Sequence, residues 1–323
     1  MINDKQILSC LPKALKSVDL PGAGKKIQGK VRDIYIKNDR RIIITTDRQS
    51  AFDYVLGFVP YKGAVLNLLS AFWFDKIRQL IPNHLVAVPD ANVSIVKNCQ
   101  PIPVEMVVRG YMTGVTNTSI WYSYSKGERI IYGIKFPEGL RKNQILPHPV
   151  ITPTTHAEIG QHDERLTRKQ IIKSGLVEAK LYRQMEKATL ALFAFGSKLA
   201  QKRGLILVDT KYEFGLYDGK LTLMDELHTP DSSRFWVAKT YSRLFKAGKE
   251  PESLSKEFLR LWYKKHGYGG EGKPAQMPAH LAVRLAHLYI RTYETLTGKK
   301  FKPFDYPIEE RIKKNIAKYL KEN

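Results

Sequence analysis

Side chains that could hold a metal ion and a phosphate lie around one predicted β-hairpin, whose turn is Asp218-Gly219. Lys211 and Glu213 share one face of its first strand, because side chains alternate along a strand with a period of two. With a two-residue turn Glu213 pairs with Met224, and with one more turn residue it pairs with Asp225. Facing carboxylates repel unless a cation separates them, and Mg²⁺ binds one or two carboxylates together with substrate phosphates. The pattern therefore suggests a Mg²⁺ site at Glu213 and Asp225; the alternative is a solvent-exposed hairpin of mixed charge.

A glycine-rich turn near the N-terminus is a second candidate for binding phosphate. Residues 24–30 have the glycines and the lysine of a P-loop, but Val31 stands where Ser or Thr is required. An alternating, strand-like segment follows in place of a helix, which excludes a P-loop. What remains is a turn that delivers Lys30 and Arg32, either to cover phosphates or as an ordinary surface hairpin.

Arginines and serines at strand ends add further candidates. Residues 225–236 lead from the hairpin into a predicted helix, whose N-terminus would carry Ser232, Ser233 and Arg234. Such a terminus binds phosphate well, although helix capping explains the serines equally well. Arg109 follows another predicted strand. The histidines of the 143–168 segment have no spacing typical of metal ligands, so we expect hydrogen bonding from them.

The elements that position these residues change in character along the chain. Periodicity predicts strands at 31–35, 41–46, 104–108, 205–209 and 221–225, and helices at 65–80, 177–199, from Pro251, from Pro278 to Gly298, and in the terminal segment 298–323. The segment 143–168 has no apolar period and is predicted to lack regular structure. Strands first and helices later, without regular alternation, favour an α+β fold.

The composition limits the class of protein. The 323 residues include 53 Lys and Arg against 31 Asp and Glu, a net charge of +22. This charge is compatible with binding of nucleic acid, with binding of anionic substrates, or with a solvated lysine-rich surface. Because zinc-finger, RGG and aromatic RNA-binding patterns are absent, we favour small anionic substrates and expect no nucleic acid. No apolar segment reaches the ~18 residues of a membrane span. Two isolated cysteines, Cys10 and Cys99, favour a reducing cytoplasm. Nothing in the sequence specifies an oligomeric state.

Seven ordered segments closely resemble the SAICAR synthetase (phosphoribosylaminoimidazole-succinocarboxamide synthase) family. They are Gly29–Tyr35, Thr46–Asp53, Val104–Gly110, Pro153–Glu158, His162–Glu164, Asp209–Gly215 and Asp225–Trp236. The helical remainder is similar to the C-terminal part of the family's longer, single-function members. Two positions depart from the family pattern: Val115 replaces a small hydroxyl residue, and His156 replaces a lysine.

The resemblance implies an enzyme of purine biosynthesis that uses ATP and Mg²⁺ to join L-aspartate to carboxyaminoimidazole ribonucleotide (CAIR), giving SAICAR, ADP and phosphate. A carboxylate is a poor electrophile, so we expect ATP to convert it first to an acyl phosphate, a step that needs positioning and charge neutralisation. The implied α+β fold has two lobes and is related to ATP-grasp and kinase-like folds: an antiparallel-sheet lobe, 1–105, and a mixed lobe with extra helices, 106–323. A kinase would share this apparatus, but the His-Arg-Asp and Asp-Phe-Gly motifs are absent.

The resemblance also implies a role for individual residues in these segments. Lys211 and Asp231 are expected to be catalytic, and Glu213 and Asp225 to hold Mg²⁺. ATP is expected to contact Lys30, Arg32, Glu105, Val107 and Lys211. The other substrates are expected to contact Ser50, Asp53, Arg109, Glu158, His162, Asp163, Ser232, Ser233 and Arg234, with the two arginines on the 5′-phosphate of CAIR.

Overall fold

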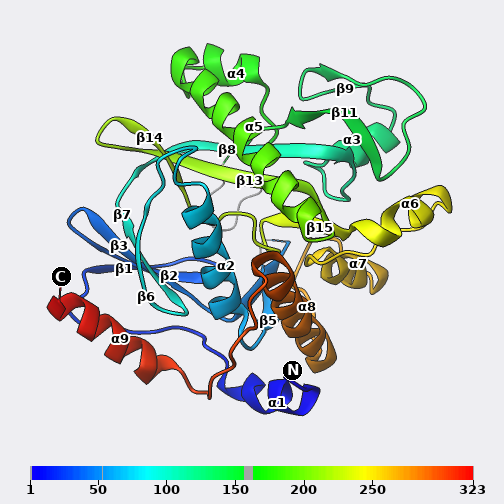
Figure 1. The fold of residues 1–323 in the computed structure, drawn as a ribbon. Helices are drawn as coiled ribbons and strands as arrows, with labels where there is room; N and C mark the ends of the chain where they lie inside the picture. Colours follow the sequence, from blue (N-terminus) through cyan, green and yellow to red (C-terminus); the bar gives the residue numbers. More distant parts are fainter. Residues whose placement is uncertain (1, 53, 156–162, 323) are drawn as a thin grey trace.

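The computed structural model describes residues 2–52, 54–155 and 163–322, which form two antiparallel sheets with helices around them (Figure 1). The first sheet has the strand order β1-β2-β3-β7-β6. Its strands are β1 (Lys25–Gln28), β2 (Arg32–Lys37), β3 (Arg40–Thr45), β7 (Val93–Lys97) and β6 (Leu85–Asp90). In β3, Ile42 and Ile44 are buried in the core, whereas Ile43 between them lines a cavity. This alternation places one face of the sheet in the core and the other at the site.

The second sheet has the order β11-β8-β13-β14, with β12 beside β8 and β15 beside β13. Its strands are β8 (Gln100–Met112), β11 (Gln144–Ile151), β12 (Thr154–Thr155), β13 (Leu205–Tyr217), β14 (Lys220–Met224) and β15 (Ser233–Val237). Two short pairs complete the strands: β4 (Arg48–Ala51) with β5 (Tyr54–Phe58), and β9 (Ile130–Ile131) with β10 (Ile134–Lys135). The central strands β8 and β13 are each 13 residues long, so they can carry several site residues along one face.

Helices cover both sheets. They are α1 (Asp4–Cys10), the 3₁₀ turn η1 (Leu11–Lys13), α2 (Lys62–Lys76), α3 (Ile120–Ser125), α4 (Arg168–Lys173), α5 (Ala179–Lys202), α6 (Ala238–Lys246), α7 (Glu257–Lys265), α8 (Ala279–Thr297) and α9 (Glu309–Glu322). Helix α5 packs on β13 and β8, and α2 packs on β3 and α8. Gly63 brings α2 close to β3, because a Cβ there would lie 2.2 Å from the carbonyl oxygen of Thr45.

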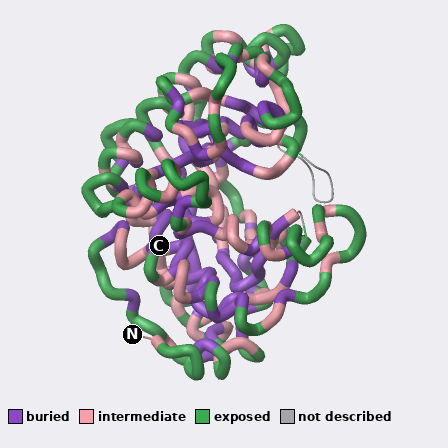
Figure 2. The backbone as a smooth tube through the Cα atoms, turned by 90° about the vertical axis from the view of Figure 1, so that its right-hand side faces the viewer, coloured by how far each residue is buried: buried purple, intermediate pink, exposed green. Residues whose placement is uncertain are grey.

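The two largest apolar cores of the described residues lie under this arrangement, and buried chain occupies both halves of the molecule in Figure 2. The first core joins the first sheet to α8 and α9, at the C-terminal end of the chain. Tyr306 strengthens this joint by donating a 2.8 Å hydrogen bond to Asp47, and Arg311 pairs with Asp90 at 2.9 Å. Strand β8 carries the chain across residue 105 without a break, and the division into lobes 1–105 and 106–323 stays a prediction.

Most predicted elements are present, and the α+β class is confirmed. The predicted strands correspond to β2, β3, β8, β13 and β14, and the predicted helices of the middle and late chain to α2, α5 and α8. Gly204 and Gly298 follow α5 and α8 with φ of +73° each, the conformation expected of a glycine that ends a helix.

The segment 143–168 was wrongly predicted to lack regular structure. Its first part forms β11 and β12, which pair with β8 at the edge of the second sheet. Pro147 and Pro149 fall where the β11 register shifts, because proline donates no hydrogen bond to a ladder. Backbone pairing along β8, which no apolar period reveals, therefore gives this segment its structure.

In the C-terminal half, helices begin later in the chain than predicted. Ser233–Val237 is strand β15, and the helix predicted there begins only at Ala238. Ser232 therefore lies in the turn before a strand and Ser233 is the first residue of that strand, so neither lies at a helix N-terminus. The helix predicted from Pro251 begins at Glu257, and the terminal helix begins at Glu309. No helix in the described part of the chain is long and apolar enough to cross a membrane.

Candidate active site

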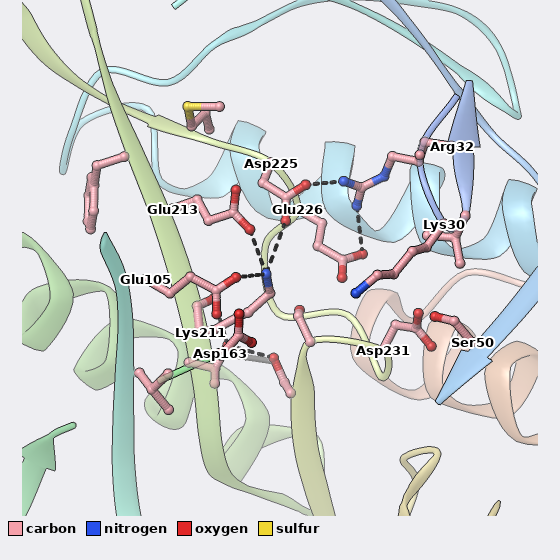
Figure 3. Close-up of a pocket in the computed structure, with 18 of the residues that line it drawn as sticks. Lys30, Arg32, Ser50, Glu105, Asp163, Lys211, Glu213, Asp225, Glu226 and Asp231 are labelled. Carbon is pink, nitrogen blue, oxygen red and sulfur yellow. Dashed lines mark hydrogen bonds and ion pairs between the residues drawn. The ribbon is translucent and has the colours of Figure 1, made fainter. Parts of the chain in front are cut away.

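A cavity of about 730 Å³ lies between the two sheets (Figure 3). Its walls include the turn before β2, the facing sides of β8 and β13, the end of β14, the 230–232 turn, the start of β15 and the start of α7. The predicted site residues that line it are Lys30, Arg32, Ser50, Glu105, Val107, Arg109, Asp163, Lys211, Glu213, Asp225, Asp231, Ser232, Ser233 and Arg234. The other three, Asp53, Glu158 and His162, lie outside the described residues. Segments far apart in sequence thus meet at one cavity.

Lys211 on β13 is surrounded by carboxylates. Its Nζ lies 2.7 Å from Glu105 Oε1, 2.5 Å from Glu213 Oε1 and 4.0 Å from Asp225 Oδ2. Glu105 on β8 and Glu213 on β13 are directly opposed in the sheet. Like charges at such positions repel, so the ammonium between them stabilises their pairing.

The structure decides between the two hairpin registers. The two-residue turn is present, and Glu213 pairs with Met224. Glu213 and Asp225 are therefore not cross-strand partners. Asp225 directly follows β14 with a φ of +66°, and its carboxylate still reaches Lys211. The like-charged partner across the sheet is Glu105, which hairpin spacing could not reveal because it lies about 100 residues earlier.

The charges of this cluster hold one another ionised. Burial would lower the pKa of Lys211, but attraction to Glu213, Glu105 and Asp225 outweighs burial and raises this pKa well above its usual value. Burial would raise the pKa of Asp225, but Arg32 and Lys211 outweigh it and lower this pKa. Arg32 on β2 donates a hydrogen bond to Asp225, so the first sheet contributes a cation to the cluster on the second.

The donor set fits Mg²⁺ brought with a nucleotide. Two carboxylates, Glu213 and Asp225, face the cavity beside Lys211. Within residues 2–52, 54–155 and 163–322, no three His, Cys, Asp or Glu side chains are grouped so that they could hold a metal alone. Mg²⁺ keeps several waters and needs only one or two carboxylates when substrate phosphates supply further ligands.

The glycine-rich turn presents Lys30 to the cavity, where Figure 3 shows its side chain between the Lys211 cluster and Asp231. The turn closes through a 2.8 Å hydrogen bond from Gly29 N to Arg32 O. Arg48 stabilises the turn, because its guanidinium donates hydrogen bonds to the carbonyl oxygens of Lys30 and Gly29 at 3.1 Å each. A cation on a supported turn is well placed to contact phosphate oxygens.

Two arginines flank Asp209 at another part of the cavity. In the register of the second sheet, Asp209 on β13 is opposite Arg109 on β8 and Arg234 on β15. Asp209 Oδ2 lies 3.3 Å from Arg109 Nη1, and Oδ1 lies 3.4 Å from Arg234 Nε. Arg109 also donates to Thr152 and to the carbonyl oxygen of Thr118. Arg234 Nε also lies 4.0 Å from Glu257 Oε2, which Arg260 contacts at 3.1 Å. Two carboxylates therefore face three guanidinium groups at this end of the cavity, which retains positive charge suited to a phosphate.

Ser232, in the turn that precedes β15, and Ser233, the first residue of β15, line the cavity next to these arginines. The turn is held by Thr229, whose Oγ1 accepts hydrogen bonds from the backbone N–H groups of Asp231 and Ser232. On the β8 side, Thr116 lines the cavity, one residue after Val115, the residue that departs from the family pattern. A hydroxyl is therefore available near the arginines.

Glu105 and Val107 lie on β8, as expected, but the Glu105 side chain is engaged within the protein. Besides Lys211, it accepts a 3.4 Å hydrogen bond from Thr154. The carbonyl oxygen of Val107 accepts a 2.8 Å bond from the backbone N–H of Thr152. Asp163 lies on the Lys211 side of the cavity in Figure 3. Roles for these residues toward ATP or substrate stay predictions.

Asp231 and Ser50 are both labelled at the same side of the cavity in Figure 3, and Asp231 has cationic neighbours that no sequence motif indicates. Its Oδ2 lies 3.2 Å from Lys256 Nζ and 3.5 Å from Lys62 Nζ. Lys62 is fully buried, and its Nζ has no hydrogen-bond partner among the residues that the structure describes. Burial would raise the pKa of Asp231, but the two lysines and a tyrosine hydroxyl, from Tyr289, outweigh burial and lower it.

Signals for the missed residues were weak. A lysine at the start of an otherwise apolar helix is the only local sign of Lys62, and Lys256 precedes α7 without any motif. Asp209 was detectable, because it lies two residues before Lys211 and shares its strand face.

Two antiparallel sheets enclose a cavity, which contains a glycine-rich turn, an acidic cluster around a lysine, and an arginine pair. This arrangement defines an α+β protein of the ATP-grasp-like class. Residues 25–277 match the family model described as SAICAR synthetase. The chain belongs to this family, which catalyses the ATP-dependent ligation of L-aspartate to CAIR, giving SAICAR, in purine biosynthesis.

Individual relatives agree over nearly the whole chain. A phosphoribosylaminoimidazole-succinocarboxamide synthase from Legionella pneumophila is 50% identical over 316 residues, which are 96% of this chain and 100% of the relative. The SAICAR synthase of Saccharomyces cerevisiae complexed with SAICAR has a TM-score of 0.77 at 32% identity and covers 90% of this chain and 100% of its own. A SAICAR synthetase in complex with ADP has a TM-score of 0.66 at 25% identity, covering 86% of this chain and 100% of its own.

Proposed function

We propose that the protein ligates L-aspartate to CAIR in this cavity in two chemical steps. The phosphates of ATP bind at the Lys211 cluster, and CAIR binds at the arginine pair. In the first step a carboxylate oxygen of CAIR attacks the γ-phosphorus of ATP, the bond to the β-phosphate breaks, and ADP leaves. In the second step the amine of L-aspartate attacks the carbonyl carbon, phosphate leaves with the transferred oxygen, and the nitrogen loses its proton. Family membership and the ADP and SAICAR complexes of relatives support this scheme.

One observation carries the residue assignment. Asp209, Lys211 and Glu213 follow one another at every second position of β13 and line the same cavity. At about 3.4 Å per residue, the step between consecutive members is about 7 Å. Strand β13 thus carries the arginine pair at Asp209 and the acidic cluster at Lys211 and Glu213. This spacing suits two phosphate-bearing substrates in one cavity.

At the ATP end, Lys211 neutralises charge on the transferred phosphoryl group, and Lys30 and Arg32 contact the phosphates from the first sheet. Glu213 and Asp225 would hold Mg²⁺, which would neutralise phosphate charge when bound. Glu105 keeps Lys211 in place, and the backbone near Val107 contacts the adenine. These contacts act through position and charge, which are the main sources of catalysis in phosphoryl transfer.

At the other end, Arg109 and Arg234 bind the 5′-phosphate of CAIR, with Ser232 and Ser233 as hydroxyl donors. Asp231, kept ionised by two lysines, holds the amine of L-aspartate beside Ser50. Asp53, Glu158, His162 and Asp163 complete the binding of CAIR and L-aspartate in this proposal.

The first prediction concerns substrate dependence. Steady release of ADP is expected only when CAIR and L-aspartate are both present, because the acyl phosphate is consumed by the amine. A coupled ADP assay with each substrate omitted in turn provides the measurement, and L-asparagine in place of L-aspartate provides a matched control. Full ADP release with CAIR alone would indicate a kinase and contradict the ligase scheme.

A further inference from the structure

Tyr289 on α8 contacts Asp231, a residue of the cavity wall, from a helix that lies beyond the residues matched by the family model, 25–277. Its Oη lies 2.8 Å from Asp231 Oδ1 and 2.8 Å from Gln49 Oε1, and the tyrosine is fully buried. Burial and the neighbouring Asp231 raise the pKa of Tyr289 well above its usual value, so its hydroxyl keeps its proton. This single proton favours the charged carboxylate, which is the stronger acceptor.

Helix α8 holds the hydroxyl in a fixed position. Leu281, Leu285 and Ala286 on the same helix are buried in the first core. Thr292 Oγ1, one turn after Tyr289, lies 3.3 Å from the carbonyl oxygen of Leu254. A helix anchored on both sides of Tyr289 can therefore hold its hydroxyl in place against Asp231.

The contacts of Asp231 are divided between its two oxygens. Lys256 and Lys62 both approach Oδ2, while the tyrosine hydroxyl contacts Oδ1. The two cations hold one oxygen and the hydrogen bond holds the other, so the contacts together set the orientation of the carboxylate. Gln49, whose Oε1 also lies 2.8 Å from the hydroxyl, donates a 3.1 Å bond to the carbonyl oxygen of Ser50. The hydroxyl thus lies between the turn of Asp231 and the strand of Ser50.

We propose that Tyr289 is a positioning residue that orients the Asp231 carboxylate toward L-aspartate, so that α8 completes the active site. The inference rests on the proposed role of Asp231 as the group that holds the amine of L-aspartate. Tyr289 itself acts through Asp231, and it is not among the cavity-lining residues. Its removal should therefore affect L-aspartate and leave ATP and CAIR unaffected.

The test compares Tyr289→Phe with Tyr293→Phe in the full-length enzyme. Tyr293 lies one turn along α8, is half-buried and does not line the cavity, so it is a matched control for the loss of a hydroxyl. We expect Tyr289→Phe to lower kcat/KM for L-aspartate about tenfold, the effect of one hydrogen bond to a charged group, with KM for ATP and CAIR unchanged. Tyr293→Phe should retain the kinetics of the unmodified enzyme. A drop in Tm without this change in L-aspartate kinetics would show a merely structural role and overturn the inference.

A double-mutant cycle with Asp231→Asn tests whether Tyr289 acts through Asp231. If it does, Tyr289→Phe has its full effect in the unmodified enzyme and almost none in the Asp231→Asn background; an equal factor in both backgrounds would overturn the inference. If the proposed role of Asp231 is wrong, the result is different: Asp231→Asn would itself leave the kinetics unchanged. Asp231 would then have no role in binding L-aspartate, and the inference about Tyr289 would be overturned with it. An impaired Asp231→Asn beside an unaffected Tyr289→Phe overturns only the role of Tyr289.

Discussion

Asp225→Asn is expected to lower kcat about 100- to 1000-fold, the range seen when one preorganised electrostatic contact to a transition state is lost. Two effects combine in this change. The carboxylate expected to hold Mg²⁺ is removed, and Arg32 and Lys211 lose the charge with which both now interact. Glu213→Gln should act in the same direction, because it removes the other carboxylate. The measurement is steady-state turnover as a function of Mg²⁺ concentration, in which half-saturation should require more Mg²⁺.

A matched control for this prediction lies on the same hairpin. Asp218 is exposed in the turn with a φ of +50°, a conformation that asparagine also adopts readily. Asp218→Asn should therefore keep both turnover and Mg²⁺ dependence. If Asp225→Asn and Glu213→Gln left the Mg²⁺ dependence unchanged, the metal assignment would be wrong, whatever happened to turnover.

Arg234→Ala is expected to raise KM for CAIR about tenfold to 100-fold while KM for ATP stays nearly constant. A charge-assisted hydrogen bond to phosphate contributes about 1.5–3 kcal/mol, which sets this range. Arg109→Ala should act in the same direction, with an additional loss of stability because Arg109 is buried and hydrogen-bonded to Thr152 and Thr118. Initial rates with each substrate varied separately provide the two KM values.

The control is Arg243→Ala, which removes an exposed arginine of α6 that does not line the cavity. Its kinetics should match those of the unmodified enzyme, which separates a local contact from a general effect of the net charge. A rise in KM for ATP in the Arg234 variant, with KM for CAIR unchanged, would mean that the two ends of the cavity have been assigned in reverse.

Local sequence predicted the elements whose signals are local. The helical spacing of α5 and the glycine after it, and the Asp218-Gly219 turn between β13 and β14, are properties of short segments, and the structure has both. Strand β11 and strand β15 were missed because their structure depends on pairing with β8 and β13, which lie far away in the chain. Hydrogen-bonded partners at such separations leave no periodic pattern in one sequence.

The same distinction applies to the site. The resemblance of seven short segments to the family indicated a set of site residues. All of those that the structure describes line one cavity. The resemblance could not reveal that Glu105 opposes Glu213, because that contact follows from the register of β8 against β13. Nor could it reveal Lys62 and Tyr289, which reach Asp231 from α2 and α8 and belong to none of the seven segments.

The central claim is that ATP phosphorylates the carboxylate of CAIR before L-aspartate attacks, and isotope transfer tests this step directly. CAIR labelled with ¹⁸O in its carboxylate is converted with ATP, Mg²⁺ and L-aspartate, and the isotope content of the released inorganic phosphate is measured by mass spectrometry. Unlabelled CAIR in ¹⁸O-water is the control and should give unlabelled phosphate. The mechanism predicts one ¹⁸O atom in each phosphate released from labelled CAIR, because the attacking oxygen stays bonded to phosphorus. Unlabelled phosphate from labelled CAIR would contradict it.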